Sequence, residues 1–323
     1  MNVYLKDYYR YLNNARELEL EKIGMEPIAR TGDYLMDNVR VYDVTDRRHA
    51  GINDVLQDLW FADCPFQNPK AHLRNTKEKA LGDLVLIRSY RDLQTRWSRK
   101  TWLYVFLVHR ITGSAASYVC DHGYRNTIVP ELGLMADMNE MVAWIREYTG
   151  KMFTSIGCQI PGFPKLPDES EYSKQSKYYL CGLAPLLIHE LDDWLSKGGY
   201  KTHRQVLNWL ADWNRGWGFN AFWFQYSLFA SDISDYFPNL VDEDSHVHYG
   251  TNSVKTLKLF GPRREWDKIV EDTIKAHPYM DLKPKGIENS LCDYWKYHKS
   301  WIPKGYVLGP DIDKTRLVRK SIL

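Results

Sequence analysis

The stretch "KTHRQVLNWLADWNRGWGFNAFWFQYSLFASDI", residues 201–233, contains two helical patterns separated by a pair of glycines. Thr202 and Gln205 have the spacing of a capping box, in which each side chain bonds the backbone of the other residue at the start of a helix. Segment 203–214 then carries apolar residues at helical spacing, and segment 220–233 is apolar on nearly every side. We therefore expect two consecutive helices, the second of them buried.

The residues between these helices, "NRGWGFNA", allow two interpretations. Gly216 and Gly218, with the small Ala221 three positions later, resemble the turn of a helix-hairpin-helix. Glycines there permit positive φ angles and a close approach to a phosphate. The amides around Asn220, at the start of the next helix, would hold the DNA backbone without reading its sequence. The alternative is a tight turn between two helices that binds nothing.

Helical periodicity also dominates the remainder of the chain, and strand candidates are few and short. The expected fold is mostly α, a helical DNA-glycosylase-like body with a helix-hairpin-helix. We expect an N-terminal helical extension (1–75), a helical catalytic and DNA-binding domain (76–305) and a basic tail (306–323). The segments expected to be helical are 3–22, 52–61, 76–98, 138–150, 176–199, 251–261 and 286–301, while 101–112 could be a helix or a strand.

Composition restricts the class of protein. The chain has 323 residues, a net charge of +2, 12 Trp and 22 Tyr, which is enough apolar material for a large core. Five scattered cysteines without a CxxC pair indicate reduced thiols in a cytoplasm. The charged N-terminus is unlike a signal peptide, and the apolar runs are too short to cross a bilayer, so we expect no membrane partner.

Two polar residues interrupt the apolar helix expected at 220–233. Gln225 and Asp232 are seven residues apart, so they share one helix face about 10 Å apart. Buried polar groups need partners. The two side chains could form hydrogen bonds with other groups of the core, or they could line a pocket that binds a polar ligand.

An acidic run follows about twenty residues after the glycine turn, at Asp242, Glu243 and Asp244. Helix-hairpin-helix DNA glycosylases place a catalytic aspartate at a similar distance from their hairpin. The run could equally be a solvated loop. The histidines in "HVH", His246 and His248, have the spacing of two metal ligands on a strand, but no third ligand is evident and we expect no metal site.

Six short phrases follow one another along the chain: "RSYR" (88–91), "VHRI" (108–111), "KMFT" (151–154), "GWGFNAFWFQYSLFASD" (216–232), "GTNSVKTL" (250–257) and "IENSLCDYWKY" (287–297). In this order they resemble one family, the phage α-glutamyl/putrescinyl thymine pyrophosphorylases, which are amino-acid:DNA transferases related to the helical domain of 5-hydroxymethyluracil DNA kinases. The chain departs from the family pattern at Arg88, His109, Asn252 and Trp295, and it has no P-loop, which favours the transferase over the kinase.

The resemblance implies an enzyme that replaces the pyrophosphate of 5-pyrophosphoryloxymethyl-deoxyuridine in DNA with an amine or amino acid and releases pyrophosphate. Such chemistry requires a flipped base, cations for the leaving group and a carboxylate that accepts the proton of the amine. The implied catalytic residues are Asp232, Asp293, Gln225 and Arg91. Pyrophosphate would bind Arg88, Arg110 and Lys296. The base would contact Tyr90, Tyr226 and Tyr297, and the duplex would contact Gly216, Gly218 and Asn220.

The implied partners are double-stranded DNA carrying a modified thymine and a small amine or amino-acid co-substrate, in the host cytoplasm of a phage infection. No cofactor is expected, although a divalent metal could assist the departing pyrophosphate. Two other functions stay open. The chain could be a helix-hairpin-helix base-excision glycosylase that uses Asp242 or Asp244, or a DNA-binding protein without catalytic activity.

Overall fold

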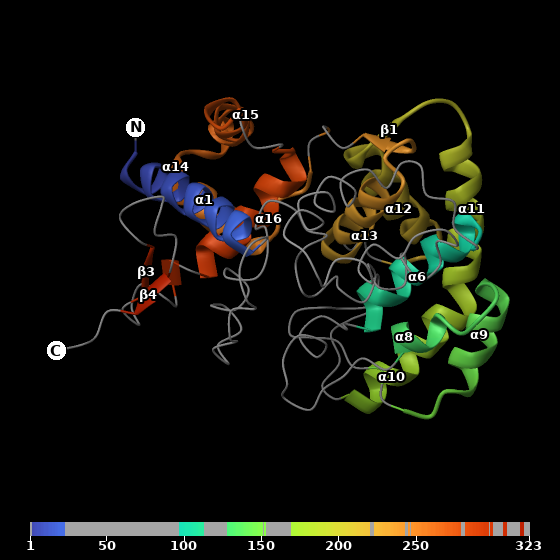
Figure 1. Ribbon diagram of the computed structural model, residues 1–323. Helices are drawn as coiled ribbons and strands as arrows, with labels where there is room; N and C mark the ends of the chain where they lie inside the picture. The colour runs from blue at the N-terminus through green and yellow to red at the C-terminus, as the bar shows by residue number, and fades with distance from the viewer. Residues whose placement is uncertain are drawn as a thin grey trace. The chain divides into compact units, whose positions relative to one another are not determined.

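The computed structural model of the chain is dominated by helices, as the sequence predicts (Figure 1). The chain divides into two compact units. The central unit comprises the described residues from 97 to 245, and the terminal unit comprises those near the two chain ends. The structure describes residues 2–22, 97–112, 128–150, 152, 169–219, 223–242, 245, 247–278, 282–296, 298–299, 306–308 and 317–319.

The terminal unit joins the first helix of the chain to its last ones. Helix α1 (Val3–Lys22) confirms the helix expected at 3–22, and it packs against α14 (Thr251–Phe260) and α16 (Pro284–Lys296), drawn beside it in orange and red in Figure 1. This grouping differs from the expected boundaries after residues 75 and 305. The reason is that Tyr8 and Tyr11 of α1 are buried in one core with side chains of the C-terminal helices.

The core of the terminal unit is aromatic and aliphatic, with Tyr8, Phe260 and Tyr294 in mutual ring contact. A short 3₁₀ turn, η5 (Arg263–Glu265), leads into α15 (Trp266–Ala276). The expected basic tail contains two strands, β3 (Tyr306–Leu308) and β4 (Leu317–Arg319), which pair antiparallel with Tyr306 opposite Arg319.

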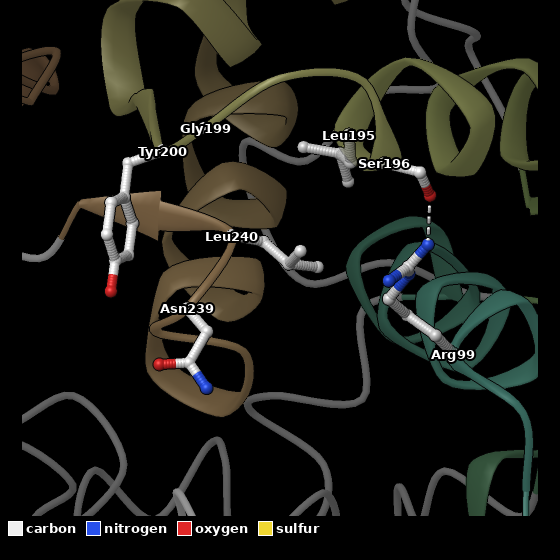
Figure 2. A pocket seen from close by; sticks show the side chains of 7 residues that line it. All are labelled: Arg99, Leu195, Ser196, Gly199, Tyr200, Asn239 and Leu240. Carbon is white, nitrogen blue, oxygen red and sulfur yellow. Dashed lines mark hydrogen bonds between the residues drawn. The ribbon is translucent and has the colours of Figure 1, made fainter.

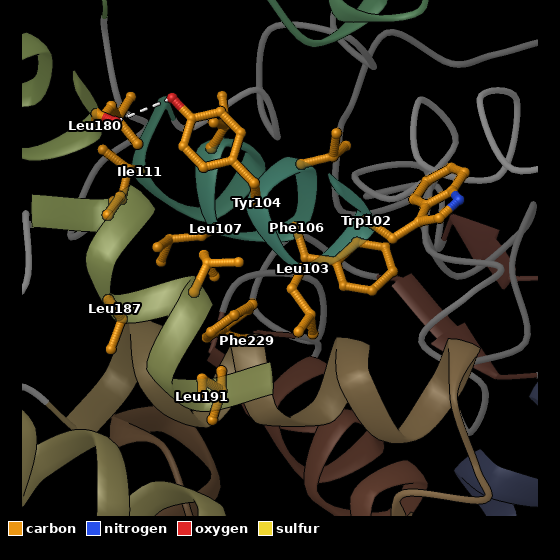
Figure 3. Packing of buried hydrophobic residues seen from close by; sticks show 14 of the residues in the cluster. Trp102, Leu103, Tyr104, Phe106, Leu107, Ile111, Leu180, Leu187, Leu191 and Phe229 are labelled. Carbon is orange, nitrogen blue, oxygen red and sulfur yellow. Dashed lines mark hydrogen bonds between the residues drawn. The ribbon is translucent and has the colours of Figure 1, made fainter. Parts of the chain in front are cut away.

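The central unit is built around α6 (Arg99–Thr112), which settles the question of a helix or a strand at 101–112. Every residue of α6 from Thr101 onward is buried, because α8 (Ile128–Leu132), α9 (Met138–Glu147), α11 (Ala184–Ser196) and α13 (Trp223–Tyr236) pack around it. Figure 3 shows Leu187 and Leu191 of α11 and Phe229 of α13 against this helix. A helix covered on all sides explains why the sequence of α6 lacks amphipathic periodicity.

The helix expected at 176–199 contains a distortion before its proline. Helix α10 (Glu169–Tyr178) continues through one π-helical turn, η4 (Tyr179–Leu183), into α11, where Pro185 occupies the first turn. Pro185 has no backbone N–H to donate to the preceding turn, and a π turn displaces the hydrogen-bond pattern by one residue at that point. The amide of Ala184 accordingly donates to the carbonyl of Tyr179.

Helices α12 (His203–Gly216) and α13 form the pair expected from residues 201–233. The capping box is confirmed: the Thr202 amide donates to Gln205 Oε1 at 2.8 Å, and the Gln205 amide donates to Thr202 Oγ1 at 3.1 Å. Two short strands join the ends of the pair. β1 (Lys201–Thr202) lies parallel to β2 (Val241–Asp242), with Lys201 opposite Val241.

Candidate functional site

A buried ion pair connects two of the phrases on which the family resemblance rests. Arg110 of α6 donates from Nε to Asp232 Oδ2 at 2.6 Å and from Nη2 to Asp232 Oδ1. The two side chains are 3% and 2% exposed. A planar guanidinium that donates to both carboxylate oxygens forms a bidentate ion pair, which is among the strongest in proteins. The same pair of donors also fits a phosphate group. The structure therefore brings the predicted pyrophosphate ligand Arg110 together with the predicted catalytic carboxylate Asp232.

Helices α6 and α13 run antiparallel. Trp102 and Phe106, early in α6, contact Tyr236 at the end of α13, whereas Arg110, late in α6, reaches Asp232 one turn earlier in α13. Gln225 lies two helical turns before Asp232 on the same face. It therefore lies beyond the last turn of α6, on the side of α13 that carries the ion pair.

Gln225 is fully buried, at 0% exposure. Neither its Oε1 nor its Nε2 has a hydrogen-bond partner among the described residues. A buried polar group without a partner costs about 1–3 kcal/mol of folding free energy, and such groups are rare in native proteins. Of the two interpretations left open for Gln225, a satisfied core residue and part of a ligand pocket, the missing partners favour the second.

Tyr226, predicted to contact the base, is instead part of the core. Its hydroxyl donates to Asn214 Oδ1 at 2.7 Å and lies 3.0 Å from the hydroxyl of Tyr179. Burial raises the pKa of the Tyr226 phenol well above its usual value, and burial also raises the pKa of Tyr179. Both phenols are therefore neutral at physiological pH, and their hydrogen bonds join α12, α13 and the π turn instead of facing a ligand.

His203 is a buried polar residue that the sequence interpretation missed. Its Nε2 lies 3.0 Å from the carbonyl oxygen of Ser227 and 3.3 Å from Ser231 Oγ, and its backbone amide donates to Ser245 Oγ at 2.8 Å. These contacts fix the start of α12 to the middle of α13. The sequence does indicate that His203 is buried, because at helical spacing it shares a face with the apolar Val206, Leu207 and Leu210.

The glycine turn ends α12 with a Schellman motif. The amide of Phe219 donates to the carbonyl of Asn214, and the amide of Gly218 donates to the carbonyl of Arg215. Gly218 has φ of +79°, the left-handed conformation that favours glycine at this position, whereas Gly216 ends the helix without a positive φ. These amides are engaged within the protein, so Gly218 and Phe219 offer no free backbone donor to a phosphate. The predicted contact at Asn220 lies outside the described residues.

Two other phrases of the resemblance meet within the terminal unit. The N-cap residue of α14, Gly250, has no side chain that could cap the helix, and Glu288 of α16 performs that role. Glu288 Oε1 accepts from the Gly250 amide at 3.0 Å and from Ser253 Oγ at 2.7 Å. Thr256 Oγ1 donates to the carbonyl of Leu291 at 2.8 Å. The phrases at 250–257 and 287–297 therefore form one packed helix pair.

The remaining predicted site residues are distributed as follows. Asp293 is half-buried on α16 of the terminal unit, and Lys296 is the last residue of that helix. Asp242 lies in β2, where its carbonyl accepts from Ser245 Oγ at 2.7 Å. Outside the described residues lie Arg88, Tyr90, Arg91, Tyr297, Asp244 and His246.

Searches of protein-family models, curated proteins and solved structures for relatives of the chain find no match. In the described part of the chain, no three His, Cys, Asp or Glu side chains gather closely enough to hold a metal ion. None of the helices described there has the length and apolar character needed to span a membrane. Function must therefore be inferred from the residues of the chain itself.

Proposed function

We propose that this chain is a DNA-modifying transferase that replaces the pyrophosphate of 5-pyrophosphoryloxymethyl-deoxyuridine with an amine or amino acid, as the resemblance to the thymine pyrophosphorylases implies. The observation that carries the proposal is the buried carboxamide of Gln225, which has no partner among the described residues. It lies on the same helix face as the Arg110–Asp232 pair. A ligand that supplies the missing hydrogen bonds would offset the loss of solvation.

A flipped pyrimidine has the complementary groups. A carboxamide presents one acceptor oxygen beside an NH₂ donor. The Watson–Crick edge of a uracil ring presents an N3–H donor beside a carbonyl acceptor. The Oε1 of Gln225 would accept from N3–H while Nε2 donates to the adjacent carbonyl. Enzymes that act on bases read an extruded base in this way, through its Watson–Crick edge.

The ion pair supplies a way to activate the carboxylate only when substrate is present. The guanidinium of Arg110 holds both oxygens of Asp232, and a pyrophosphate oxygen pair can occupy the same donors. When the leaving group takes Arg110, the Asp232 carboxylate loses its cationic partner. The negative charge of the carboxylate is then no longer neutralised by its neighbour. The freed carboxylate becomes a better general base.

The chemical step follows from this exchange. The amine nitrogen attacks the 5-methylene carbon and forms a C–N bond. The C–O bond to the pyrophosphate breaks, and its electron pair leaves on the pyrophosphate oxygen, where Arg110 stabilises the charge. Asp232 takes the proton that the nitrogen releases. The products are the aminomethylated base and free pyrophosphate, so atoms and charge balance.

The test is an incubation of duplex DNA bearing 5-pyrophosphoryloxymethyl-deoxyuridine with the full chain and glycine, glutamate or putrescine. We expect pyrophosphate release that depends on the amine, and mass spectrometry of the digested nucleosides should show the new C–N product. Unchanged DNA with every amine would overturn the proposal. Abasic sites would instead identify a glycosylase, and salt-sensitive binding without chemistry would identify a DNA-binding protein.

Two variants locate the activity. Asp232→Asn should lower the rate about 10²–10⁴-fold, because it removes the general base. Asp193→Asn is the matched control, since Asp193 is a half-exposed carboxylate on α11 that pairs with Lys100.

Gln225→Met keeps the volume of the side chain and leaves the ion pair intact, and it should lower kcat/KM roughly tenfold or more through loss of base contacts. Full activity of Gln225→Met would exclude this residue from the site.

A further inference from the structure

A hollow of about 410 Å³ lies in the central unit where the end of α11 passes the end of α13 (Figure 2). Its lining residues are Arg99, Leu195, Ser196, Gly199, Tyr200, Asn239 and Leu240. Arg99 begins α6, and Arg110 lies eleven residues further along the same helix, roughly 16 Å away. The hollow is therefore separate from the Gln225 and Asp232 site.

The guanidinium of Arg99 is fixed at one side of this hollow. Its Nε donates to Asp192 Oδ1, and its Nη2 donates to Ser196 Oγ, the bond drawn in Figure 2. Ser196 Oγ in turn donates to the carbonyl of Asp192 at 2.8 Å. No described residue binds the remaining nitrogen, Nη1. The neighbours therefore hold the guanidinium in one orientation and leave both N–H donors of Nη1 available for an anion.

The opposite side of the hollow presents a ring and a carboxamide. Tyr200 is 66% exposed, and Asn239 is exposed beside it (Figure 2). Neither side chain has a hydrogen-bond partner among the described residues. Leu195 and Leu240 lie between them and Arg99. Gly199, with φ of +68°, has open space where a side chain would begin, so a flat ligand could approach its backbone.

We propose that this hollow binds a nucleotide, independently of the transferase chemistry. A base would stack on Tyr200 over the two leucines, the carboxamide of Asn239 would pair with its edge, and the phosphate would meet Arg99 Nη1. Aromatic stacking and an Arg–phosphate contact are the general means by which proteins hold single nucleotides. A carboxamide pairs bidentately with adenine, so adenine is the preferred base. The volume suits one nucleotide.

The test measures binding of adenosine 5′-monophosphate by calorimetry and of labelled single-stranded (dA)₁₂ by fluorescence anisotropy, both with the full chain. Tyr200→Ala should weaken binding about 5- to 150-fold, while Tyr200→Phe keeps the ring and should stay within about threefold of the native chain. Asn239→Ala should remove the preference for (dA)₁₂ over (dT)₁₂. Tyr178→Ala is the control, because Tyr178, the last residue of α10, is a similarly exposed tyrosine, at 62%.

Binding of the monophosphate that depends on Tyr200 would indicate a free nucleotide as the ligand, and binding of the oligonucleotide alone would indicate a strand of nucleic acid. Either result supports the site. Equal binding by Tyr200→Ala and Tyr178→Ala would overturn it. Competition by inorganic phosphate as strong as that by the nucleotide would also overturn it, because the hollow would then hold only an anion. These measurements require no transferase substrate, so their failure leaves the proposed function untouched.

Discussion

In the terminal unit, buried and half-buried polar groups form hydrogen bonds between one helix and another. The hydroxyls of Tyr8 and Ser290 lie 2.6 Å apart, Tyr294 donates to Asp7 at 2.8 Å, and Glu288 caps α14. In the central unit, α13 carries a carboxylate paired with a guanidinium and, two turns away, a carboxamide with no described partner. The hydrogen bonds of the terminal unit stabilise its fold. The carboxamide without a described partner in the central unit reduces stability, which is expected where a protein retains groups for a ligand.

The largest difference between the units should appear when a carboxylate is removed. Asp232→Ala removes the carboxylate that accepts two hydrogen bonds from the buried Arg110 guanidinium, so it should lower the free energy of unfolding by about 3–5 kcal/mol. Asp7→Ala removes a partly exposed carboxylate that accepts from Tyr294, and it should cost about 1 kcal/mol. Urea denaturation of both variants checks this ratio, and equal losses would remove the distinction between the units.

A double substitution tests whether the Arg110–Asp232 ion pair itself stabilises the central unit. Arg110→Met together with Asp232→Leu replaces the ion pair by apolar side chains of similar size. Such replacements are neutral or stabilise by about 1–4 kcal/mol, because the desolvation of two charges is avoided. We expect the double variant to be at least as stable as the native chain and to lack transferase activity. A variant less stable than Asp232→Ala would show that the pair stabilises the fold.

The next largest effect concerns Gln225. Replacing glutamine by methionine should raise stability at position 225 and lower it at position 205. Gln225→Met removes an unsatisfied buried amide and should raise the free energy of unfolding by about 1–3 kcal/mol. Gln205→Met removes the side chain that completes the capping box of α12 and should lower it by about 0.5–1 kcal/mol. Thermal denaturation compares the two. A loss of stability in Gln225→Met would mean that the native carboxamide is satisfied.

Glu288 provides a test within the terminal unit. Glu288→Ala should lower stability by about 1–2 kcal/mol, because the Gly250 amide and the Ser253 hydroxyl lose their acceptor. Glu288→Gln keeps a neutral acceptor oxygen and should lose roughly half as much. Amide hydrogen exchange at the start of α14 should report the same order. A loss in Glu288→Gln as large as that in Glu288→Ala would indicate that a neutral acceptor cannot replace the charged one.

The smallest expected effects distinguish the two glycines of the turn. Gly218→Ala forces a side chain into the left-handed region and should cost about 1–2 kcal/mol. Gly216→Ala, within the last turn of α12 and with open space where its Cβ would lie, should stabilise by up to about 1 kcal/mol. If Gly216→Ala instead weakens DNA binding without loss of stability, the turn contacts the duplex in a way that the Schellman motif does not explain.

Local patterns in the sequence predicted several of these features. The capping box at Thr202, the buried face shared by Gln225 and Asp232, and the helix at 3–22 all depend on residues within a few turns of each other. Contacts between distant segments could not be predicted in this way. Arg110 meets Asp232 across 122 positions, and Glu288 caps Gly250 across 38. These partners are selected by helix packing, which periodicity alone does not specify.

The parallel pairing of β1 with β2 has a consequence for how the central unit could change over evolution. Lys201 and Val241 lie opposite each other, and the Lys201 amide also donates to the carbonyl of Leu240 at 2.9 Å. The chain therefore enters and leaves the α12–α13 hairpin at one place. A segment with adjacent ends can be lengthened, shortened or exchanged for a homologous one without rerouting the surrounding backbone. Recombination between related genes could in this way alter the hairpin as a unit while preserving the helices that pack against it.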